Sequence, residues 1–500
     1  MAALFGVHIG NSSVCLAICK DEERTEVVAN DAGDRITPTI LQWSPSGSVV
    51  GKTAQLELFR NSQNTVIRNK EVINTNICED ELNHLRSKVP YKINKSESEI
   101  KYELLYEGKQ HHVAPREIVG WIFKKILSIA QAAVGVNKEI KIVATVPLNY
   151  SQKSIQLIKD VAKIAGFHVL QVVDEACAAA LGCGLGLDPY EPPYYCIVYR
   201  VGGVSVDATI ILIQDGMFTI VESVHKYNLG GTLFTEKLSE FLASEFTRQY
   251  RTVEISERGK YKLLTTAETA KQVLSIQNVV QCSCESLGGG YDFNCSVSRA
   301  RYENIIAPLI PEIIRPITEV LNKANIAAEK IAKVVTCGGT LKTPKLQETI
   351  RKLLPSTEVI NCTPDEVIAL GAAKQAGYLT GHTKIPDTLG IDTPSLSTSL
   401  QIKVKQDGKE SMTHIVPEYS SVPLRKKYEE TAISQSITVS LVDKNNKTLG
   451  SVSVSNLEPP SKVTIILDIS KDGQMHLTLV NQASKEKTHM KYNLTDISKI

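Results

Sequence analysis

A glycine turn between two β-branched runs is the part of this chain whose residues best suit phosphate binding. The run 196–201 leads into Gly202-Gly203, and Ser205 and Asp207 follow at the start of a second apolar run. This order is typical of a strand, a tight turn and a strand. Glycines at such a turn leave backbone N–H groups open, and a concavity of N–H groups suits an anion. A hairpin whose turn simply requires glycine is the alternative for this stretch alone.

The same pattern occurs near the N-terminus and again in the second half of the chain. A strand-like run ends at Gly10-Asn11-Ser12 and a further run follows, and a third glycine turn, Gly338-Gly339-Thr340, follows the run 333–337. Two similar hairpins in successive halves indicate a duplicated α/β core whose turns face one another across a cleft. We interpret this arrangement as a nucleotide clamp.

Charged residues near these turns have two interpretations each. Asp174-Glu175 follows the apolar run 169–173 and opens an alanine-rich helix, where acids are either ordinary helix-end charges or a carboxylate aimed into the cleft. Glu268, Lys271 and Ser275 are spaced i, i+3 and i+7, so they share one side of a helix. That side is either a solvated stripe or a polar shelf for a base and ribose.

Buried strands and amphipathic helices alternate through the first 379 residues and must position these groups. The run 140–146 predicts a buried strand, Pro115 and Glu117 begin a helix, and residues 64–112 are polar and insertion-like. The predicted helix carries one isoleucine stripe: Ile118, Ile122, Ile126 and Ile129. Small residues at Gly371-Ala372-Ala373 permit close packing of a later helix.

The last hundred residues change character, because apolar and polar residues alternate there between short turns. We therefore predict a nucleotide-binding domain over 1–379 with lobes at about 1–188 and 189–379, a linker at 380–395 and an all-β sandwich at 396–500.

Composition excludes several classes of protein. Fifty-six Lys and Arg balance 54 Asp and Glu, so no global field favours nucleic acid or an anionic membrane. The eleven cysteines lie mostly in apolar runs, as free thiols do in a reducing compartment. Cys282-x-Cys284, with Cys295 beyond, lacks the second pair or histidines typical of zinc, and we assign no metal ligand. No run reaches the ~18 to 20 apolar residues of a membrane span. We expect a cytosolic protein with no membrane or direct nucleic-acid partner.

Over essentially its whole length the chain resembles the 70-kDa heat-shock protein family. The segments that carry this resemblance are Gly6-Val7-His8-Ile9-Gly10, residues 30–38, Asn64-Thr65-Val66 with Lys70, Thr145-Val146-Pro147, Glu175, Leu229-Gly230-Gly231, Ser298-Arg299-Ala300-Arg301, Cys337-Gly338-Gly339-Thr340 and Pro364-Asp365-Glu366. The resemblance implies an actin-like two-lobed ATPase domain with a duplicated RNase H-like core, a linker, a peptide-binding β-sandwich and a helical lid.

Residue roles follow from the resemblance position by position. Lys70 matches the catalytic lysine, and Glu175 and Asp207 match residues near the phosphates and metal. The positions expected to bind ATP are Gly10, Asn11, Ser12, Gly202, Gly203, Ser205, Gly230, Gly231, Glu268, Lys271, Ser275, Gly338, Gly339, Thr340, Lys342 and Asp365. Gln272 and Lys342 stand where the family has arginines, so the adenosine side is mostly intact.

The metal side departs from the family. His8 and Arg200 stand where it has aspartates, Asn11-Ser12 replaces a threonine pair, and Val204 replaces a third glycine. Mg²⁺ prefers carboxylates, phosphate oxygens and water. The two replacements shift the local charge by about +3, and at ~5 Å and a dielectric of ~20 each step costs several kcal/mol against Mg²⁺. We therefore expect ATP as the cofactor, with Mg²⁺ as a second ligand only at a site that His8 and Arg200 weaken. Because Arg200 is able to neutralise phosphate itself, we expect ATP binding to survive, while loss of the ordered attacking water leaves hydrolysis weak or absent.

The linker and the lid, through which the family's domains signal to one another, also differ in this chain. Residues 385–392 are the sole counterpart of its acidic, leucine-rich linker, and the chain stops after the sandwich without a lid. These features look most like the short, divergent branch that pairs with a zuotin-type J-protein in the ribosome-associated complex. We predict a co-chaperone for nascent chains that stabilises the J-protein at the ribosome and helps it stimulate a separate, active 70-kDa chaperone.

Other functions remain as alternatives. The runner-up is an active ATP-dependent chaperone in which Lys70, Glu175 and Asp207 suffice for its own hydrolysis cycle. A large divergent exchange factor usually has long insertions and helical tails that are absent here. A sugar kinase shares the lobes but leaves the β-sandwich unexplained.

Overall fold

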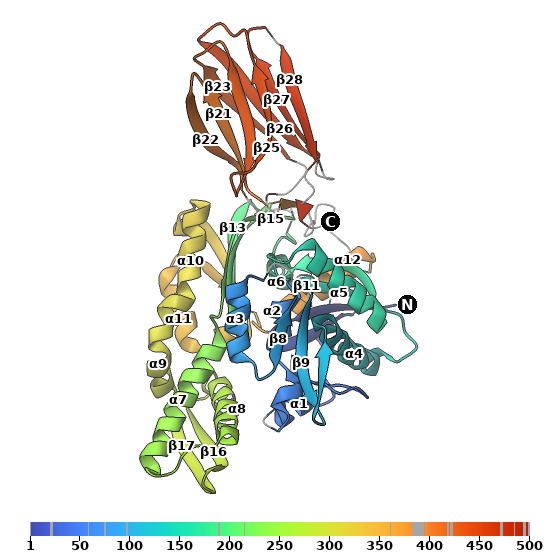
Figure 1. Ribbon diagram of the computed structural model, residues 1–500, viewed down its shortest axis with the longest axis vertical. Coiled ribbons are helices and arrows are strands. Elements are labelled where there is room, and N and C mark those ends of the chain that lie inside the picture. The colour runs from blue at the N-terminus through green and yellow to red at the C-terminus, as the bar shows by residue number, and fades with distance from the viewer. Residues whose placement is uncertain are drawn as a thin grey trace.

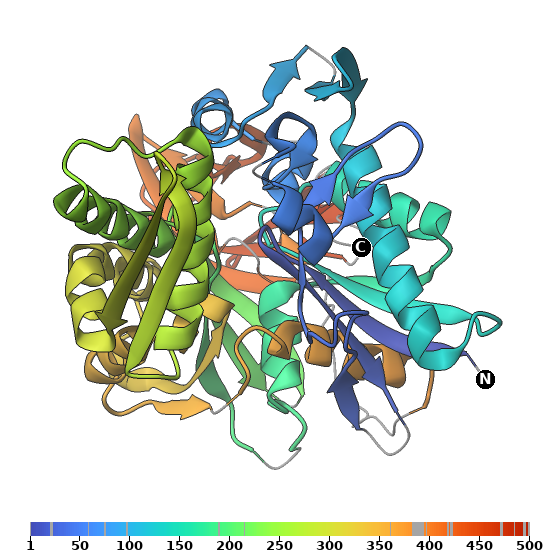
Figure 2. The same ribbon diagram turned by 90° about the horizontal axis from the view of Figure 1, so that it is seen from below.

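The computed structural model describes residues 2–498 except 21–23, 59, 75–76, 97–98, 189–190, 215, 361, 383–394, 397, 418–419, 421–423, 471–473, 485 and 494–496. Two α/β lobes lie side by side, and an all-β region extends beyond one end of them along the long axis (Figure 1). Seen from below, the two lobes form separate halves around their sheets (Figure 2). No helix within the described ranges is long and apolar enough to cross a bilayer.

The first lobe is built on a sheet with strand order β12-β11-β1-β2-β3, to which β4 adds by pairing with β2. These strands are β1 Ala3–Ile9, β2 Ser13–Cys19, β3 Thr25–Val27, β4 Thr37–Pro38, β11 Ile140–Val146 and β12 His168–Asp174. β1 runs antiparallel to β2 and parallel to β11, which is parallel to β12. The β1–β2 turn therefore lies in the middle of the sheet.

The second lobe repeats this arrangement with the order β15-β14-β13-β18-β19. These strands are β13 Tyr194–Val201, β14 Ser205–Gln214, β15 Met217–Tyr227, β18 Ile331–Cys337 and β19 Glu358–Ile360. β13 runs antiparallel to β14 and parallel to β18, as β1 does to β2 and β11. The predicted duplication is confirmed, and it places His8 and Arg200 at equivalent positions, each two residues before its turn.

Helices cover both sheets. They are α1 Lys52–Glu57, α2 Asn69–Ile73, α3 Glu79–Lys88, α4 Pro115–Val134, α5 Gln152–Ala165, α6 Glu175–Gly182, α7 Gly231–Gln249, α8 Glu257–Leu274, α9 Arg299–Ile306, α10 Ile310–Ala324, α11 Pro344–Leu353 and α12 Val367–Leu379, with 3₁₀ turns η1 Ser62–Asn64, η2 Ala307–Leu309, η3 Ala328–Lys330 and η4 Gly339–Lys342. In α4, Pro115 occupies the first turn and the Glu117 carboxylate accepts the Ala114 N–H at 3.2 Å. The predicted isoleucine stripe of α4 is buried throughout.

Smaller sheets complete the lobes. They are β6-β5-β7 (Val49–Val50, Leu41–Gln42, Thr65–Val66), β10-β9-β8 (Lys109–Val113, Ile100–Tyr106, Lys92–Lys95) and the hairpin β16 Val279–Gly288 with β17 Tyr291–Ser298. The insertion-like segment 64–112 is more integrated than its polarity suggests. Tyr102 and Leu104 of β9 are fully buried in the core of the first lobe, because alternate residues of one strand face inward.

A third core lies between the lobes, where α6 packs against α12. A Cβ added to Gly371 would lie 1.7 Å from the Ala178 carbonyl oxygen, and one on Gly182 would lie 2.2 Å from that of Val367. The prediction that residues 371–373 permit close packing is confirmed. Because α6 begins at Glu175, this contact also fixes the position of that carboxylate.

The C-terminal region is a sandwich of two four-stranded sheets, β22-β21-β24-β25 and β23-β26-β27-β28. The strands are β20 Ser395–Leu396, β21 Leu400–Gln406, β22 Lys409–Val416, β23 Leu424–Ala432, β24 Ile437–Asp443, β25 Thr448–Val454, β26 Ser461–Ile469, β27 Gln474–Asn481, β28 Lys487–Asn493 and β29 Ile497–Ser498. Alternate residues of β21, β24 and β27 form its core, as predicted. Beyond α12 the described residues hold strands and no helix, and most of the predicted linker lies outside them.

Candidate functional site

The turns of the two lobes meet, as the repeated pattern predicts. The Gly10 N–H donates to Ser13 O at 2.8 Å and the Gly202 N–H donates to Ser205 O at 2.9 Å, so both turns close in the same way. A Cβ on Gly203 would lie 2.1 Å from Ser12 Oγ. Residues from opposite halves of the duplicated core are therefore in contact at this point.

Two further glycine turns converge on the same backbone. The N–H of Gly231 donates to Gly202 O at 3.0 Å, and Thr340 Oγ1 donates to the same oxygen at 3.0 Å. Gly338 has φ 92°, and a Cβ there would lie 2.2 Å from Val201 O. A side chain at these positions would push the turns apart, which explains why glycine occupies them.

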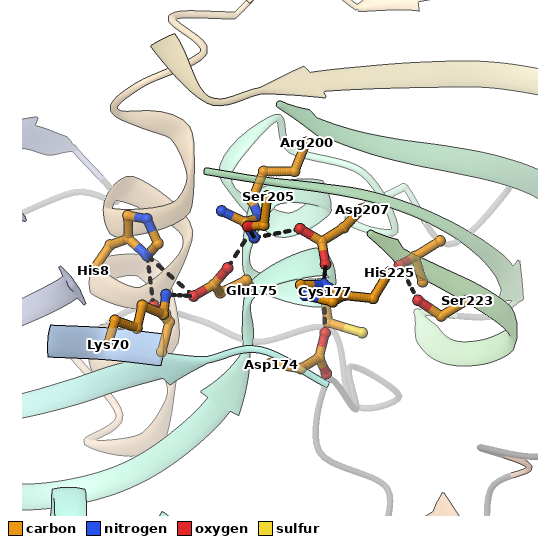
Figure 3. A network of polar contacts seen from close by, with 12 residues as sticks. His8, Lys70, Asp174, Glu175, Cys177, Arg200, Ser205, Asp207, Ser223 and His225 are labelled. Atoms are coloured by element: carbon orange, nitrogen blue, oxygen red, sulfur yellow. Dashed lines mark hydrogen bonds and ion pairs between the residues drawn. The ribbon is translucent and has the colours of Figure 1, made fainter. Parts of the chain in front are cut away.

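Four charged side chains form a network beside the turns (Figure 3). Lys70 Nζ from α2 donates to Glu175 Oε1 at the start of α6. Arg200 Nε from β13 lies 3.2 Å from Glu175 Oε2, and its Nη2 pairs with Asp207 Oδ2 of β14. Arg200 Nη2 also donates to Ser205 Oγ at 2.9 Å. The three predicted catalytic residues are thus brought together, with Arg200 between the two carboxylates.

A histidine flanks each end of the network. His8 Nδ1 lies 3.0 Å from Thr145 Oγ1 and 3.7 Å from Glu175 Oε1. At the other end, His225 Nδ1 of β15 contacts Asp207 Oδ1. His225, which pairs with Asp207 across the β14–β15 ladder, was not among the residues predicted from the sequence. A shift of register between Ile210 and Ile211 prevents simple counting along the hairpin from finding this pair.

Burial and neighbouring charges set the protonation of this network. Burial lowers the pKa of His8 to about 3, and nearby Lys70 and Arg200 add to the effect against Glu175, so the imidazole is neutral. Burial alone would raise the pKa of Glu175, but Lys70 and Arg200 hold it at about 2. Asp207 likewise has a pKa well below its usual range beside Arg200 and His225, despite its burial. Two cations and two anions therefore coexist out of water.

The residues of the expected adenosine shelf are tied to the glycine turns. Glu268 Oε2 accepts hydrogen bonds from Thr235 Oγ1 and Lys271 Nζ, both at 2.6 Å. Lys271 Nζ also donates to Gly231 O at 3.1 Å. Ser275 Oγ instead donates to the carbonyl of Gln272 at 2.6 Å. These contacts favour the shelf over an isolated solvated stripe, with Ser275 turned toward its own helix.

Near the glycine turns lie two buried polar atoms without a hydrogen-bond partner among the described residues. Lys342 Nζ donates to Asp365 Oδ2 at 2.6 Å, while Asp365 Oδ1 and Asn11 Oδ1 are buried and unsatisfied. The next residue, Glu366, binds Arg35 through two hydrogen bonds of 2.6 and 2.7 Å that join the two lobes. An unsatisfied buried oxygen is costly, so Asn11 and Asp365 are suited to contact a ligand.

The chain is similar to known proteins over nearly its whole length. A model of the Hsp70 protein family matches residues 4–497. The chain belongs to the Hsp70 family. It is 34% identical to heat shock 70 kDa protein 14 of Bos taurus over 499 residues, covering 96% of this chain and 97% of that protein. The Homo sapiens protein of that name is 32% identical with the same coverage, and that of Danio rerio is 32% identical over 494 residues, covering 97% of both chains.

Membership assigns the general activity. The chain is an Hsp70 chaperone, and the Hsp70 family binds ATP. The α/β fold of its lobes is that of the Hsp70 nucleotide-binding region. Among the residues predicted to hold nucleotide, the glycine turns, Lys271 with Glu268, and Lys342 with Asp365 all surround the same interlobe region.

Proposed function

We propose that this Hsp70 binds ATP between its lobes, hydrolyses it weakly or not at all, and acts in the cytosol as a co-chaperone of nascent chains. In this proposal it forms a ribosome-associated complex with a zuotin-type J-protein and helps that protein stimulate a separate, active 70-kDa chaperone. The observation that carries the proposal is the position of Arg200, whose guanidinium occupies the space between Glu175 and Asp207.

The residues of the cleft fit a nucleotide. Glycine turns with close backbone approach suit phosphates, and the Glu268–Lys271 pair and the Asp365 carboxylate supply polar groups on either side for a base and ribose. Asn11 Oδ1 and Asp365 Oδ1 are buried with no hydrogen-bond partner among the described residues. The phosphates of ATP would supply negative charge for the Arg200 guanidinium, which lies beside the Gly202-Gly203 turn through its hydrogen bond to Ser205 Oγ.

The same residues do not fit Mg²⁺. Both carboxylates are already paired with Lys70 or Arg200, and His8 presents a nitrogen where the family has a carboxylate. Mg²⁺ prefers oxygen ligands in near-octahedral geometry. Arg200 supplies positive charge in a fixed place but cannot carry the ordered waters of a metal ion. This supports retained binding with impaired hydrolysis, in which the orienting groups for an attacking water are missing.

The partner assignment follows from what the chain does and does not retain. An Hsp70 that does not cycle on ATP needs another protein to supply the energy for client folding, which a J-protein complex with an active chaperone would do. The described residues beyond α12 form strands only, so they provide no helical lid over a bound client. A scaffold that holds a partner near the ribosome is consistent with both features.

Single-turnover hydrolysis of radiolabelled ATP tests the central claim. We expect the wild-type protein to bind ATP equally with Mg²⁺ and with excess EDTA, and to cleave it far more slowly than an active Hsp70 measured beside it. The double variant His8→Asp/Arg200→Asp should bind ATP in a Mg²⁺-dependent manner. A wild-type rate equal to that of the active Hsp70 would overturn the proposal. Co-sedimentation of the protein with ribosomes only when the J-protein is present tests the partner.

An active, self-cycling chaperone is the second candidate. It is favoured by the contact of Lys70 with Glu175 and the proximity of Asp207, because these are the predicted catalytic residues. Stimulation of ATP turnover by a J-domain, together with ATP-dependent release of a bound peptide, would establish this candidate. Absence of both responses would leave the co-chaperone.

A further inference from the structure

The outer face of one sheet of the sandwich concentrates positive charge. In the sheet β23-β26-β27-β28 (Figure 1), Val463, Ile465 and Leu467 of β26 are buried in the core, so the alternate residues face outward. The register of the three strand pairings aligns the outward residues of neighbouring strands. The charged residues of this face are Arg425, Lys427, Glu429, Lys462, Asp468, Lys487 and Lys491. We call it the basic face, because five cations stand against two carboxylates.

The two carboxylates neutralise only the cations of β23. Asp468 Oδ1 lies 3.2 Å from Arg425 Nε, and Glu429 Oε1 lies 3.8 Å from Lys427 Nζ. The three other lysines of the basic face are exposed and have no acidic partner among the described residues. Two of them lie on β28, at the opposite edge of the sheet from β23. The uncompensated charge is therefore concentrated away from the carboxylates.

The opposite face of the sandwich differs, although it also carries lysines. Glu410 of β22 lies 2.6 Å from Lys403 Nζ and 3.9 Å from Lys405 Nζ of β21, so one carboxylate serves both. Their partners on β24 are the hydroxyl residues Ser440 and Thr438. Composition predicted no nucleic-acid partner, because 56 Lys and Arg balance 54 Asp and Glu over the whole chain. The fold instead gives one face a local excess of positive charge.

Two imidazole rings lie among the cations of the basic face. His489 of β28 is exposed, and His476 of β27 pairs with Lys491 of β28. His476 and Arg425 also line a hollow of about 320 Å³ where β27 begins. Imidazole and guanidinium planes stack on bases, and lysines bind the phosphates between them. Both kinds of group needed for a single-stranded nucleic acid are therefore present on one flat sheet.

Other polyanionic partners fit the basic face less well. Binding in a membrane interface needs large apolar or aromatic anchors, whereas the outward apolar residues in the middle of this face, Ile466 and Val480, are half-buried aliphatic side chains. An acidic protein would pair with the lysines but would leave the imidazole rings without a stacking partner. Beyond α12 the described residues include no helix that covers the face.

We propose that the basic face binds single-stranded RNA, with Lys462, Lys487 and Lys491 contacting phosphates and His489 stacking on a base. A flat sheet presents all of these groups to an extended strand, whereas a duplex keeps its bases stacked inside. The choice of RNA over DNA rests on the proposed function at the ribosome. The binding of a single strand rests on the basic face alone.

Fluorescence anisotropy of a labelled uridine RNA of about 20 nucleotides, titrated with the full chain, tests the proposal. Three phosphate contacts predict a slope of about −2 for log affinity against log salt, a loss of about 20-fold between about 50 and 200 mM NaCl. Lys487→Gln/Lys491→Gln should reduce the slope to about −0.7 and weaken binding at least about tenfold at low salt. The matched control Lys403→Gln/Lys405→Gln, on the opposite face, should change neither.

Two further variants separate stacking and folding from charge. His489→Ala should weaken binding about tenfold at both salt concentrations with an unchanged slope, because stacking releases no counterions. His414→Ala, at an exposed position of β22, should have no effect. Lys487→Arg/Lys491→Arg keeps the charge and should keep the affinity, so a loss in the glutamine variant is not a loss of folding.

The absence of RNA binding by the wild-type chain at low salt, or equal losses for the glutamine variants on β28 and β21, would overturn the proposal. Tighter binding to DNA of the same sequence, to phosphatidylserine vesicles or to polyglutamate would overturn the assignment to RNA. The titration contains neither ATP nor a J-protein, so its failure is distinct from failure of the proposed function, which the hydrolysis assay measures.

Discussion

The two ends of the interlobe cleft place their charges in different surroundings. In the buried network, Arg200 and Glu175 have side chains only 11% and 6% exposed, whereas beside the Gly338-Gly339 turn Lys342 is 42% exposed in its pair with Asp365. The interaction energy of an ion pair depends strongly on its surroundings, because water screens the charges of the exposed pair and not those of the buried one. Replacements at the buried end therefore have to compensate one another, while single replacements at the exposed end are tolerated.

Removing the central cation should break the buried end most severely. Arg200→Met leaves Glu175 and Asp207 without one of their cations in a buried site, and we expect a loss of about 3–5 kcal/mol in the free energy of unfolding. Urea denaturation at pH 7 measures it. The matched control is Arg425→Met, whose 3.2 Å pair with Asp468 is largely exposed and should contribute less than about 1 kcal/mol. Equal losses for both variants would contradict the comparison.

Glu71 is a buried carboxylate whose burial outweighs the nearby charge of Arg68, so the stability of the protein should fall as this group ionises. Burial raises the pKa of Glu71, next to Lys70, to about 7. The folded state then binds more protons than the unfolded state between pH 4.5 and 7, so its stability falls as pH rises through that window. Glu71→Gln should remove this fall and stabilise the protein at pH 8 by about 3 kcal/mol relative to pH 4.5. Denaturation at both pH values measures it, and an unchanged pH profile would show that Glu71 is not the cause.

The contact between the turns should show coupling between the lobes. Gly203→Ala places a methyl group against Ser12 Oγ and should cost about 1–3 kcal/mol by overpacking. Ser12→Ala in the same chain removes that oxygen and should recover part of the loss. A double-mutant cycle on the free energy of unfolding measures the coupling. Additive effects would mean that the two turns do not touch.

Removing the exposed ion pair of Lys342 should have the smallest effect on the free energy of unfolding. Lys342→Ala removes a half-exposed pair, and we expect a loss below about 1 kcal/mol that disappears at high salt. Denaturation in low salt and in 1 M NaCl, about a 3 Å screening length, measures it. A salt-insensitive loss of several kcal/mol would place Lys342 with the buried network instead.

Periodicity made much of this fold predictable from the sequence. The isoleucine stripe of α4 and the alternating strands of the sandwich are local patterns that burial imposes directly. The repeated glycine turns also indicated that Gly203 and Ser12 would lie on facing halves. These predictions succeeded because each depends on spacing within one element or on a repeated order of elements.

Contacts between distant elements were not predictable in the same way. The pairing of His225 with Asp207 depends on a shifted register between β14 and β15. The burial of Tyr102 was hidden by the charged residues around it. In each case the decisive information is three-dimensional packing, which one sequence does not contain.

The backbone contact between α6 and α12 has a mechanical consequence. Side chains usually lie between the backbones of packed helices and adjust to small displacements. At Gly182 and Gly371, the backbones of α6 and α12 are instead in direct contact. We therefore expect a displacement of α6 at Glu175 to move α12, up to its end at Leu379, by nearly the same amount. Since α12 is the last helix before the sandwich among the described residues, we expect a ligand bound in the cleft to displace the C-terminal end of α12 as a rigid body.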